Sequence, residues 1–515
     1  MEIHEQNSYT VSKKSTFFDF PFFFYSLPLI HLAVALPLAY HLNIWSDEAS
    51  SLYSTQDGFF VALGNSVNEK QAPLYFIFLS LWRLLDSSIF FARLLSVVCS
   101  VFSIGAFFVI VRRFWDEKTA LFATFFFSVH PYLFWASTEI RVYSLVITLS
   151  LFLLILFERC FLRDENRNAW RYPAFAVLAL ISLYTNFYLG FLLAGFLVAL
   201  VILKKVEAAK RYFVVMTFVG VLFFPMIWLA AANSSGSIDG TAFDYGTAEG
   251  LRRVWHHLLY FGLPTEMMPP ENQTLISLFR LWAARLILLA GAGALFTGWL
   301  KPGPRMRFFG TLTFVVAAFL TLSYFVIGTL YVEIRHAAVL FVPFTLLLVA
   351  VFNRAAPSGM WRKRYFAVVG VVLIFFYSYG LTAIYPGWTK RGDWTRVAAY
   401  VEANEENGQP VVVFRCYEAL AFTQSYEGVN KVLPDERFFD WNYEGEMGTV
   451  DVWPLQISYV ISVIPRDRDF VWLVTEEDCQ TSPACLPLEN FVKENYTVVR
   501  QKDFYKERVR LLKKR

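Results

Sequence analysis

Charged residues are scarce in this chain: Asp, Glu, Lys and Arg supply 17% of its 515 residues, whereas 56% are hydrophobic and 18% aromatic. A soluble protein of this length has no need for so much apolar surface, so the soluble class is excluded. A mean hydropathy of +0.45 is typical of a protein that crosses a membrane many times. The formal net charge of +4 is small and says little about partners.

Motifs of several enzyme classes are also missing. The sequence contains no HExxH metalloprotease motif, no GxSxG nucleophile elbow and no Walker A sequence. No glycine-rich phosphate cradle or soluble nucleotide fold precedes the apolar runs, so no nucleotide-sugar site is apparent.

What the chain does contain is a series of about eleven apolar runs, each close to the ~20 residues with which a helix crosses a bilayer core of ~30 Å. They lie near residues 18–42, 89–111, 119–136, 143–160, 172–187, 188–203, 212–232, 274–299, 308–328, 337–353 and 365–385. The first run is not followed by a small-residue cleavage site, so we interpret it as a retained helix and not as a signal peptide.

Basic residues gather on one side of these runs. Clusters precede the first run and follow the second, fourth, sixth, eighth and tenth, at Lys13–Lys14, Arg112–Lys118, Arg159–Arg171, Lys204–Arg211, Lys301–Arg307 and Arg354–Arg364. The positive-inside rule identifies that side as the cytoplasm. It predicts a multi-pass inner (plasma) membrane protein with a cytoplasmic N-terminus, and it places the loop 44–88 and the tail 386–515 on the periplasmic face.

Both outer segments are long enough to carry structure of their own. In the loop, residues 72–85 (APLYFIFLSLWRLL) are apolar but shorter than a span, which indicates an interfacial helix. The tail mixes helix-like segments with short β-branched runs: helices at 393–402 and near Asn490, and strands at 411–414, 470–474 and 496–499. We therefore expect a membrane domain over 1–385 and a soluble α/β domain over 386–515.

The five cysteines agree with this topology. Cys99 and Cys160 lie in apolar runs and are most simply buried side chains. Cys479 and Cys485 lie in a turn-like stretch of the tail, where an oxidising compartment would allow them to pair. Cys416 is left over, which leaves an alternative pairing open.

Polar residues recur at the outer ends of the runs. They are Asp47, Glu48, Glu69, Lys70, Gln71, Tyr75, Arg93, Glu139, Arg141, Tyr143, Asn186, Tyr188, Glu333, Arg335 and His336. Any one of them alone is explained by a charge at a helix end that reaches the interface. Together they combine carboxylates, which can take a proton from a hydroxyl, with cations that suit a phosphate. A phosphate-linked lipid donor would need both groups at one site.

The segments that hold these residues resemble the GT-C glycosyltransferases. WSDEAS (45–50), ARLLSVV (92–98), WASTEIRVYSL (135–145), YTNFY (184–188) and EIRHAAVLFVPF (333–344) follow in the order typical of that fold. The likeness is greatest to the bacterial branch of the protein O-mannosyltransferase and aminoarabinose-transferase superfamily. It covers residues 17–385, and the tail resembles the outer domain of many bacterial members.

This resemblance implies inverting transfer of a sugar from a polyprenyl-phosphate donor on the periplasmic face. Asp47 would be the general base, and Glu48 would orient the acceptor or the sugar. The donor and its phosphate would be bound by Lys70, Arg93, Glu139, Arg141, Tyr143 and Arg335. Glu69, Gln71, Tyr75, Asn186, Tyr188, Glu333 and His336 would line the acceptor side or the rest of the pocket.

Two departures from the family concern histidine. Gln71 and Asn186 stand where many members have histidine, and Lys70 is the candidate to compensate for the first loss. No histidine-based metal site is expected, whereas a requirement for a divalent cation is left open. The acceptor could be a lipid, a glycan or a protein, and no nucleic-acid partner is expected.

Two other functions fit a membrane protein of this kind. A lipid-linked sugar transporter or flippase should carry ionisable residues near the bilayer midplane and interrupted, repeated spans. Here the charges lie at the outer rim instead. A non-catalytic membrane scaffold whose outer domain binds a partner is the third reading, and the sequence does not exclude it.

Overall fold

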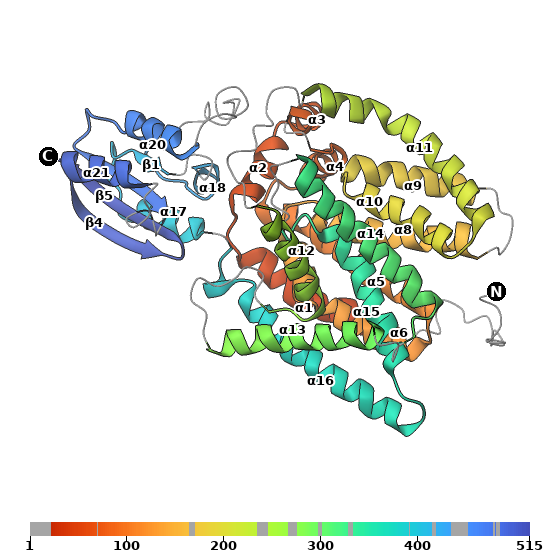
Figure 1. Cartoon of the computed structure of the whole chain (residues 1–515). Coiled ribbons are helices and arrows are strands. Elements are labelled where there is room, and N and C mark those ends of the chain that lie inside the picture. Colours follow the sequence, from red (N-terminus) through yellow and green to blue (C-terminus); the bar gives the residue numbers. More distant parts are fainter. Residues whose placement is uncertain are drawn as a thin grey trace.

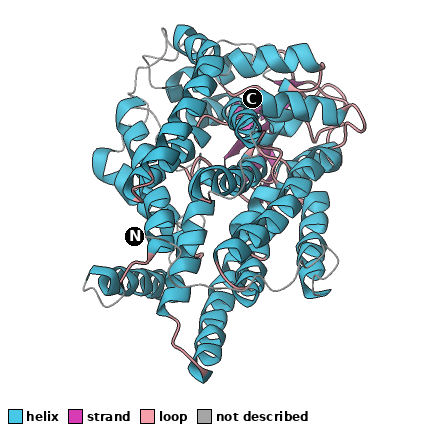
Figure 2. Ribbon diagram, turned by 90° about the vertical axis from the view of Figure 1, so that its right-hand side faces the viewer, coloured by secondary structure: helices cyan, strands magenta, loops and turns pink. Residues whose placement is uncertain are grey.

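The computed structural model describes residues 22–68, 71–163, 170–233, 246–265, 275–296, 301–327, 333–390, 392–414, 419–433, 452–476, 479 and 485–515. A large helical part makes up most of the molecule, and a small sheet with its own helices lies at one end (Figure 1). In Figure 2, turned by 90°, the strands lie behind the helical part, so the sheet is confined to that end.

The helical part runs from residue 22 to residue 383. Its helices are α1 (Phe22–His41), α2 (Ser46–Ser54), α3 (Phe59–Asn68), α4 (Leu74–Arg83), α5 (Ile89–Phe114), α6 (Glu117–Ser128), α7 (Pro131–Thr138), α8 (Tyr143–Phe157), α9 (Arg171–Thr185), α10 (Leu189–Ile202), α11 (Val206–Asn233), α12 (Gly246–Gly262), α13 (Leu275–Phe296), α14 (Pro304–Ile327), α15 (Ala338–Ala355) and α16 (Met360–Ala383). A π-helical turn, Glu158–Leu162, continues α8. Of these elements, α12 lies between two predicted spans and was not expected.

The fold class is confirmed as a polytopic helical membrane protein with a C-terminal α/β region, but the count of eleven spans is not. Among the described residues, seven helices are long and apolar enough to cross a membrane, or up to nine if two bent pairs each count as one span. The runs 172–187 and 188–203 form α9 and α10, which have 15 and 14 residues. At 1.5 Å per residue they reach only about 22 Å, short of a bilayer core.

Sharp bends bring the site residues to helix ends. The chain turns by 82° between α1 and α2 and by 53° between α6 and α7. His130 marks the second bend, because its Nδ1 accepts a hydrogen bond of 3.0 Å from the Tyr132 amide while Pro131 occupies the first helical position. Nearby, Gly380 lets α16 pass close to α7, since a Cβ there would lie 2.8 Å from Pro131.

The tail forms a five-stranded mixed sheet with the order β2-β1-β3-β5-β4. Its elements are α17 (Trp394–Glu402), β1 (Val411–Val413), α18 (Ala419–Thr423), β2 (Val432–Leu433), α20 (Val452–Val463), β3 (Phe470–Glu476), α21 (Leu486–Asn495), β4 (Tyr496–Phe504) and β5 (Glu507–Lys514), preceded by a 3-10 turn, Pro386–Trp388. The strands β2, β1 and β3 are parallel, whereas β5 pairs antiparallel with β3 and β4. The three predicted strands and the helix at 393–402 are confirmed; β2 and β5 were not predicted.

One face of this sheet packs against the helical part of the molecule. Val411 and Val413 of β1 belong to a buried cluster that also contains Ile44 and Leu52 of the outer loop, and α18 packs on α2. Val412, which alternates to the other face, belongs to a second cluster with α20 and α21. The outer loop and the tail therefore share a core.

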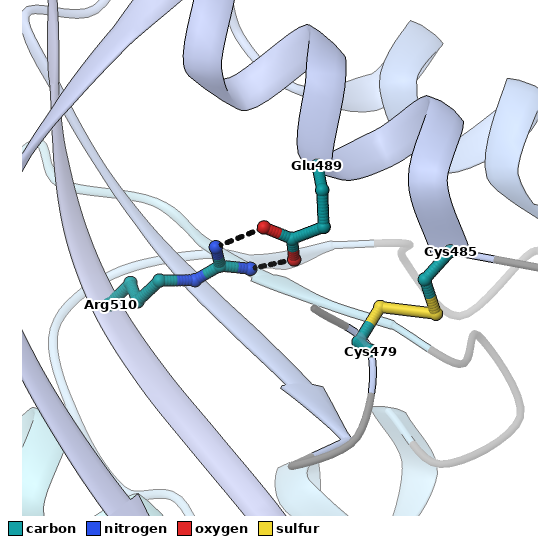
Figure 3. The surroundings of a disulfide bond; sticks show 4 residues. All are labelled: Cys479, Cys485, Glu489 and Arg510. Carbon is teal, nitrogen blue, oxygen red and sulfur yellow. Dashed lines mark hydrogen bonds and ion pairs between the residues drawn. A yellow bond between two sulfur atoms is a disulfide. The ribbon is translucent and has the colours of Figure 1, made fainter. Parts of the chain in front are cut away.

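The second face carries the predicted cysteine pair. Cys479 and Cys485 form a disulfide, with their Cα atoms 5.1 Å apart. Close to it, the Glu489 carboxylate of α21 accepts two hydrogen bonds, of 2.6 and 2.7 Å, from Arg510 of β5 (Figure 3). Cys416 lies outside the described residues.

Candidate active site

Asp47 lies in the first turn of α2 and pairs with an arginine from a distant loop. Its Oδ2 forms an ion pair with Nη1 of Arg335, which lies in the short link between α14 and α15. On its other side, Arg335 Nε lies 2.9 Å from Glu333 Oε2. The side chains of Asp47 and Arg335 keep 23% and 18% of their surface exposed, so a ligand can reach both.

A second arginine, Arg141, lies beside the backbone of Asp47 and within electrostatic range of its carboxylate. Arg141 Nη1 donates to Ser51 Oγ at 3.1 Å and approaches the Asp47 carbonyl oxygen at 3.5 Å, and the guanidinium also bonds Tyr143. Its buried Nε has no hydrogen-bond partner among the described residues. Burial lowers the pKa of Arg141 and of Arg335, but Tyr143 and Asp47 outweigh it and hold both above the usual value. Both arginines are therefore firm cations that frame Asp47.

The neighbouring acid, Glu48, has the opposite surroundings. Its side chain is fully buried, and Arg93 donates to its two oxygens at 3.2 and 3.1 Å. The Ile140 amide and the Lys390 ammonium reach Oε1 at 3.0 and 2.7 Å. Successive helical residues point ~100° apart, which explains how adjacent carboxylates reach such different surroundings.

Arg93 has no donor left for a phosphate in this conformation. A guanidinium has five N–H donors, and here each one is used. Besides the two bonds to Glu48, Nη1 donates to two backbone carbonyls and Nη2 to a third, those of Ala39, Leu42 and Asn43. Arg93 is fully buried, so it fixes the end of α1 to the start of α2.

Glu139, which follows α7, is also buried. Its Oε1 lies 3.2 Å from Lys390 Nζ, and its Oε2 accepts a bond of 2.6 Å from Trp45 Nε1. Burial raises the pKa of the Glu139 carboxyl, although Lys390 opposes that shift. Burial and the neighbouring Arg93 lower the pKa of the Lys390 ammonium, because both disfavour its charged form. Two acids and two bases thus share one buried, electrically balanced cluster.

The remaining predicted residues lie around this centre. Tyr188 lies within electrostatic range of Arg335, and its ring is 5.9 Å from the His336 ring. Tyr75 is buried, and its hydroxyl has no hydrogen-bond partner among the described residues. Asn186 accepts a bond of 2.9 Å from the Tyr188 amide and so starts α10. The half-buried Gln71 bonds the Ser66 carbonyl through its own amide, at 2.8 Å, so its backbone ties it to α3.

Glu69 and Lys70 lie outside the described residues. Within the part of the chain that the structure describes, no group of three His, Cys, Asp or Glu side chains is arranged to hold a metal ion.

Two members of the site escaped sequence analysis. Trp45 lies under Arg335, with the guanidinium carbon 5.6 Å from the ring centroid. Lys390 follows the last span, where a lysine normally marks only the membrane interface. Gly392, two residues further along the chain, adopts a positive φ of 88°, a backbone conformation that glycine allows.

One family model matches part of the chain. Residues 70–228, from before α4 to near the end of α11, match the profile described as dolichyl-phosphate-mannose-protein mannosyltransferase. This match confirms the resemblance noted from the sequence and supports a membrane glycosyltransferase. The comparison with curated proteins found no match to the chain.

Two solved structures are similar over most of the chain. ArnT from Cupriavidus metallidurans bound to undecaprenyl phosphate is 15% identical, with a TM-score of 0.47, over 95% of this chain and 97% of that one. The Archaeoglobus fulgidus oligosaccharyltransferase, in complex with Zn and sulfate, is 10% identical, with a TM-score of 0.43, over 91% of this chain and 71% of that one.

Proposed function

We propose that the protein is an integral-membrane, inverting glycosyltransferase that moves a sugar from a polyprenyl-phosphate donor to a hydroxyl acceptor on the periplasmic face. The observation that carries this proposal is an accessible carboxylate, Asp47, framed by Arg335 and Arg141 where α2 follows the first apolar helix. The mannosyltransferase-like segment 70–228 supports it independently, because Arg141 and Tyr143 belong to that segment.

The chemistry assigned to these groups is direct displacement. Asp47 takes the proton of the acceptor hydroxyl as its oxygen attacks the anomeric carbon. The bond between that carbon and the phosphate oxygen breaks, and the phosphate leaves with the bonding electrons. Arg335 and Arg141 stabilise the negative charge that develops on the leaving phosphate. One displacement of this kind inverts the configuration of the sugar.

The ion pair between Asp47 and Arg335 implies that the donor binds before Asp47 can act as the base. A carboxylate that is held by a guanidinium has one oxygen occupied and is a poor proton acceptor. A donor phosphate is a stronger attraction for Arg335, since it offers bidentate, charge-assisted bonds. Donor binding would therefore draw Arg335 from Asp47 and free the base for the acceptor.

Glu48 and Arg93 take supporting roles in this proposal. Both were expected to contact substrate, but both are fully buried and bonded to each other. Breaking a buried pair of this kind by removing one partner costs about 3–5 kcal/mol. We assign them to holding α1, α2 and the link 139–142 in fixed positions relative to one another, which determines where the Asp47 side chain points.

A transporter or flippase is the second candidate, and the position of the ionisable groups weighs against it. The cluster lies at helix ends and in the links 139–142 and 333–337, and not along the middle of the long helices. A scaffold has no use for two arginine side chains held beside an accessible aspartate.

The test is sugar transfer by the purified full chain in detergent or nanodiscs. Polyprenyl phosphates that carry different sugars are supplied as donors, with lipid, glycan and peptide hydroxyls as acceptors. We expect release of polyprenyl phosphate and a product of inverted anomeric configuration, and transfer that is at least about 100-fold slower in the Asp47→Asn variant. Folded wild-type protein that turns over none of the donors would refute the proposal, and donor translocation across a vesicle membrane without transfer would favour a flippase.

A further inference from the structure

We propose that Lys390, in the link to the C-terminal domain, is a positioning residue for the reaction. It acts through Glu139 and Trp45 on Arg335, so that the start of the tail is part of the active site. This inference deepens the proposed function and rests on it.

Lys390 is almost completely buried, and its ammonium group is fully used. Nζ lies 2.7 Å from Glu48 Oε1 and 3.2 Å from Glu139 Oε1, and it donates to the Thr138 carbonyl at 2.8 Å. An ammonium has three N–H donors, so these three contacts account for all of them. The side chain is therefore held in one place, and it holds Glu139 in turn.

Trp45 connects Glu139 to Arg335, the residue proposed to bind the donor phosphate. Glu139 Oε2 accepts from the Trp45 indole at 2.6 Å, which fixes the plane of that ring. The Arg335 guanidinium lies over the ring at 5.6 Å, within the range of a cation–π contact. Trp45 immediately precedes α2, the helix that carries Asp47. A shift of the indole would thus move the platform of Arg335 relative to the base.

The backbone around Lys390 is pinned to the same place. Asn43 accepts a bond of 2.8 Å from the Lys390 amide at its Oδ1, and its Nδ2 donates to the Gly392 carbonyl at 2.5 Å. Asn43 lies in the turn between α1 and α2. The link that joins α16 to α17 is therefore fastened to the turn that presents Asp47.

Lys390, at the start of the tail, thus supplies the second positive charge of the buried cluster. Glu48 and Glu139 would share a single buried cation, Arg93, without Lys390. A buried and uncompensated carboxylate is costly, so Glu139 would become protonated or turn away, and its bond to Trp45 would weaken.

The experiment compares kcat, donor KM and thermal stability in the full chain for Lys390→Met and for Lys390→Met combined with Glu139→Gln. The double variant has a neutral cluster, so we expect its melting temperature to recover toward that of the wild type. We expect kcat per folded enzyme to stay about 10- to 100-fold below the wild-type value, because the indole is no longer held by a fixed carboxylate. Lys493→Met is the matched control, since it makes the same change of side chain at an exposed position of the tail, on α21.

A double-mutant cycle with Trp45→Phe tests the route. If Lys390 acts through the indole, its substitution costs much less in a Trp45→Phe background than in the wild type. Additive losses would overturn the route, and recovery of kcat together with stability in the neutral double variant would reduce Lys390 to a structural charge. If Lys390→Met does not fold, the neutral double variant still decides between these outcomes.

Failure of the proposed function shows in a different measurement. It appears as a folded wild-type protein that transfers no sugar from any polyprenyl-phosphate donor. Failure of the role of Lys390 appears as an active wild type whose neutral double variant is equally active. Binding of sugar-free polyprenyl phosphate gives a second readout, which we expect to weaken in the double variant because Arg335 is no longer held by its platform.

Discussion

Arg335 and Asp47 are 288 residues apart in sequence and form an ion pair at the accessible face of the site. The next residue, Glu48, pairs with Arg93 in the buried interior. One short helix, α2, therefore carries an accessible carboxylate, which we propose for the chemistry, and a buried, fully bonded carboxylate in consecutive positions. This separation assigns different consequences to substitutions that look alike in sequence.

Substitution of Asp47 by Asn should remove activity without removing the fold. Asn is the same size but cannot accept a proton, and general-base catalysis contributes about 10²–10⁴-fold to rate. We expect kcat to fall by at least about 100-fold in a transfer assay with a polyprenyl-phosphate donor. The affinity for the donor should not weaken, because Arg335 loses its competing partner.

The control for this substitution is Asp57→Asn, at an exposed position outside the helices of the loop. It should leave kcat, donor KM and the melting temperature unchanged. An Asp47→Asn enzyme that keeps its melting temperature and most of its kcat would rule out Asp47 as the base.

Substitution of Arg335 by Gln should act on the donor. A hydrogen bond to a charged group contributes about 1.5–3 kcal/mol, which corresponds to a rise of about 10- to 100-fold in donor KM. The acceptor KM should change far less. Steady-state kinetics with each substrate varied in turn measures the two constants.

Arg335→Lys refines the test, because lysine keeps the charge but loses the planar, bidentate fork. We expect the donor KM of Arg335→Lys to lie between that of the wild type and that of Arg335→Gln. Arg500→Gln, on the exposed strand β4, is the matched control. Equal increases in the two KM values for Arg335→Gln would contradict a specific phosphate contact.

The sequence was sufficient for the parts of this molecule that depend on local pattern. Strong hydropathy identified the long helices, and β-branched runs identified β1, β3 and β4. The strand β5 was missed because Glu507–Lys514 (ERVRLLKK) mixes basic residues with its buried ones. The short helices α9 and α10 were read as full spans because composition does not reveal where an apolar helix stops.

The site shows the same limit more clearly. Asp47, Arg141 and Arg335 could be proposed because each lies at the predicted outer end of an apolar run. Their grouping into an accessible and a buried half depends on helix rotation and on tertiary contacts, which hydropathy does not encode. The place of Lys390 in the buried cluster depends on how the chain folds back after the last span. In the sequence, Lys390 looks like any lysine at the membrane interface.

Loss of the disulfide between Cys479 and Cys485 should weaken the tail and leave the chemistry intact. The two residues are six positions apart, and closing so short a loop restricts the unfolded chain by about 2 kcal/mol. We expect the double substitution of these cysteines by Ala to lower the free energy of unfolding by about 2 kcal/mol. Transfer per folded molecule should be unchanged, because the disulfide lies on the face of the sheet turned away from the cluster shared with the loop. A fall in kcat at constant folded fraction would show that the two faces are coupled.

Stability should respond to pH through Glu139. In the fold, burial raises the pKa of this carboxyl above its ordinary value of 4.5, against the opposing effect of Lys390. A carboxyl with a raised folded pKa favours its protonated form in the native state. Its contribution to stability is therefore complete below about pH 4.5 and is lost as the pH rises through the folded pKa.

Glu139→Gln cannot titrate and should not show that loss. We expect the melting temperature of the wild type, relative to the Gln variant, to decrease as the pH rises from 4.5 toward 8 in detergent. Glu494→Gln, at an exposed position on α21, should follow the wild type throughout. A difference that instead increases with pH would mean that Lys390 and Trp45 together favour the ionised carboxylate, and the buried cluster would then hold Glu139 as a full charge at every pH.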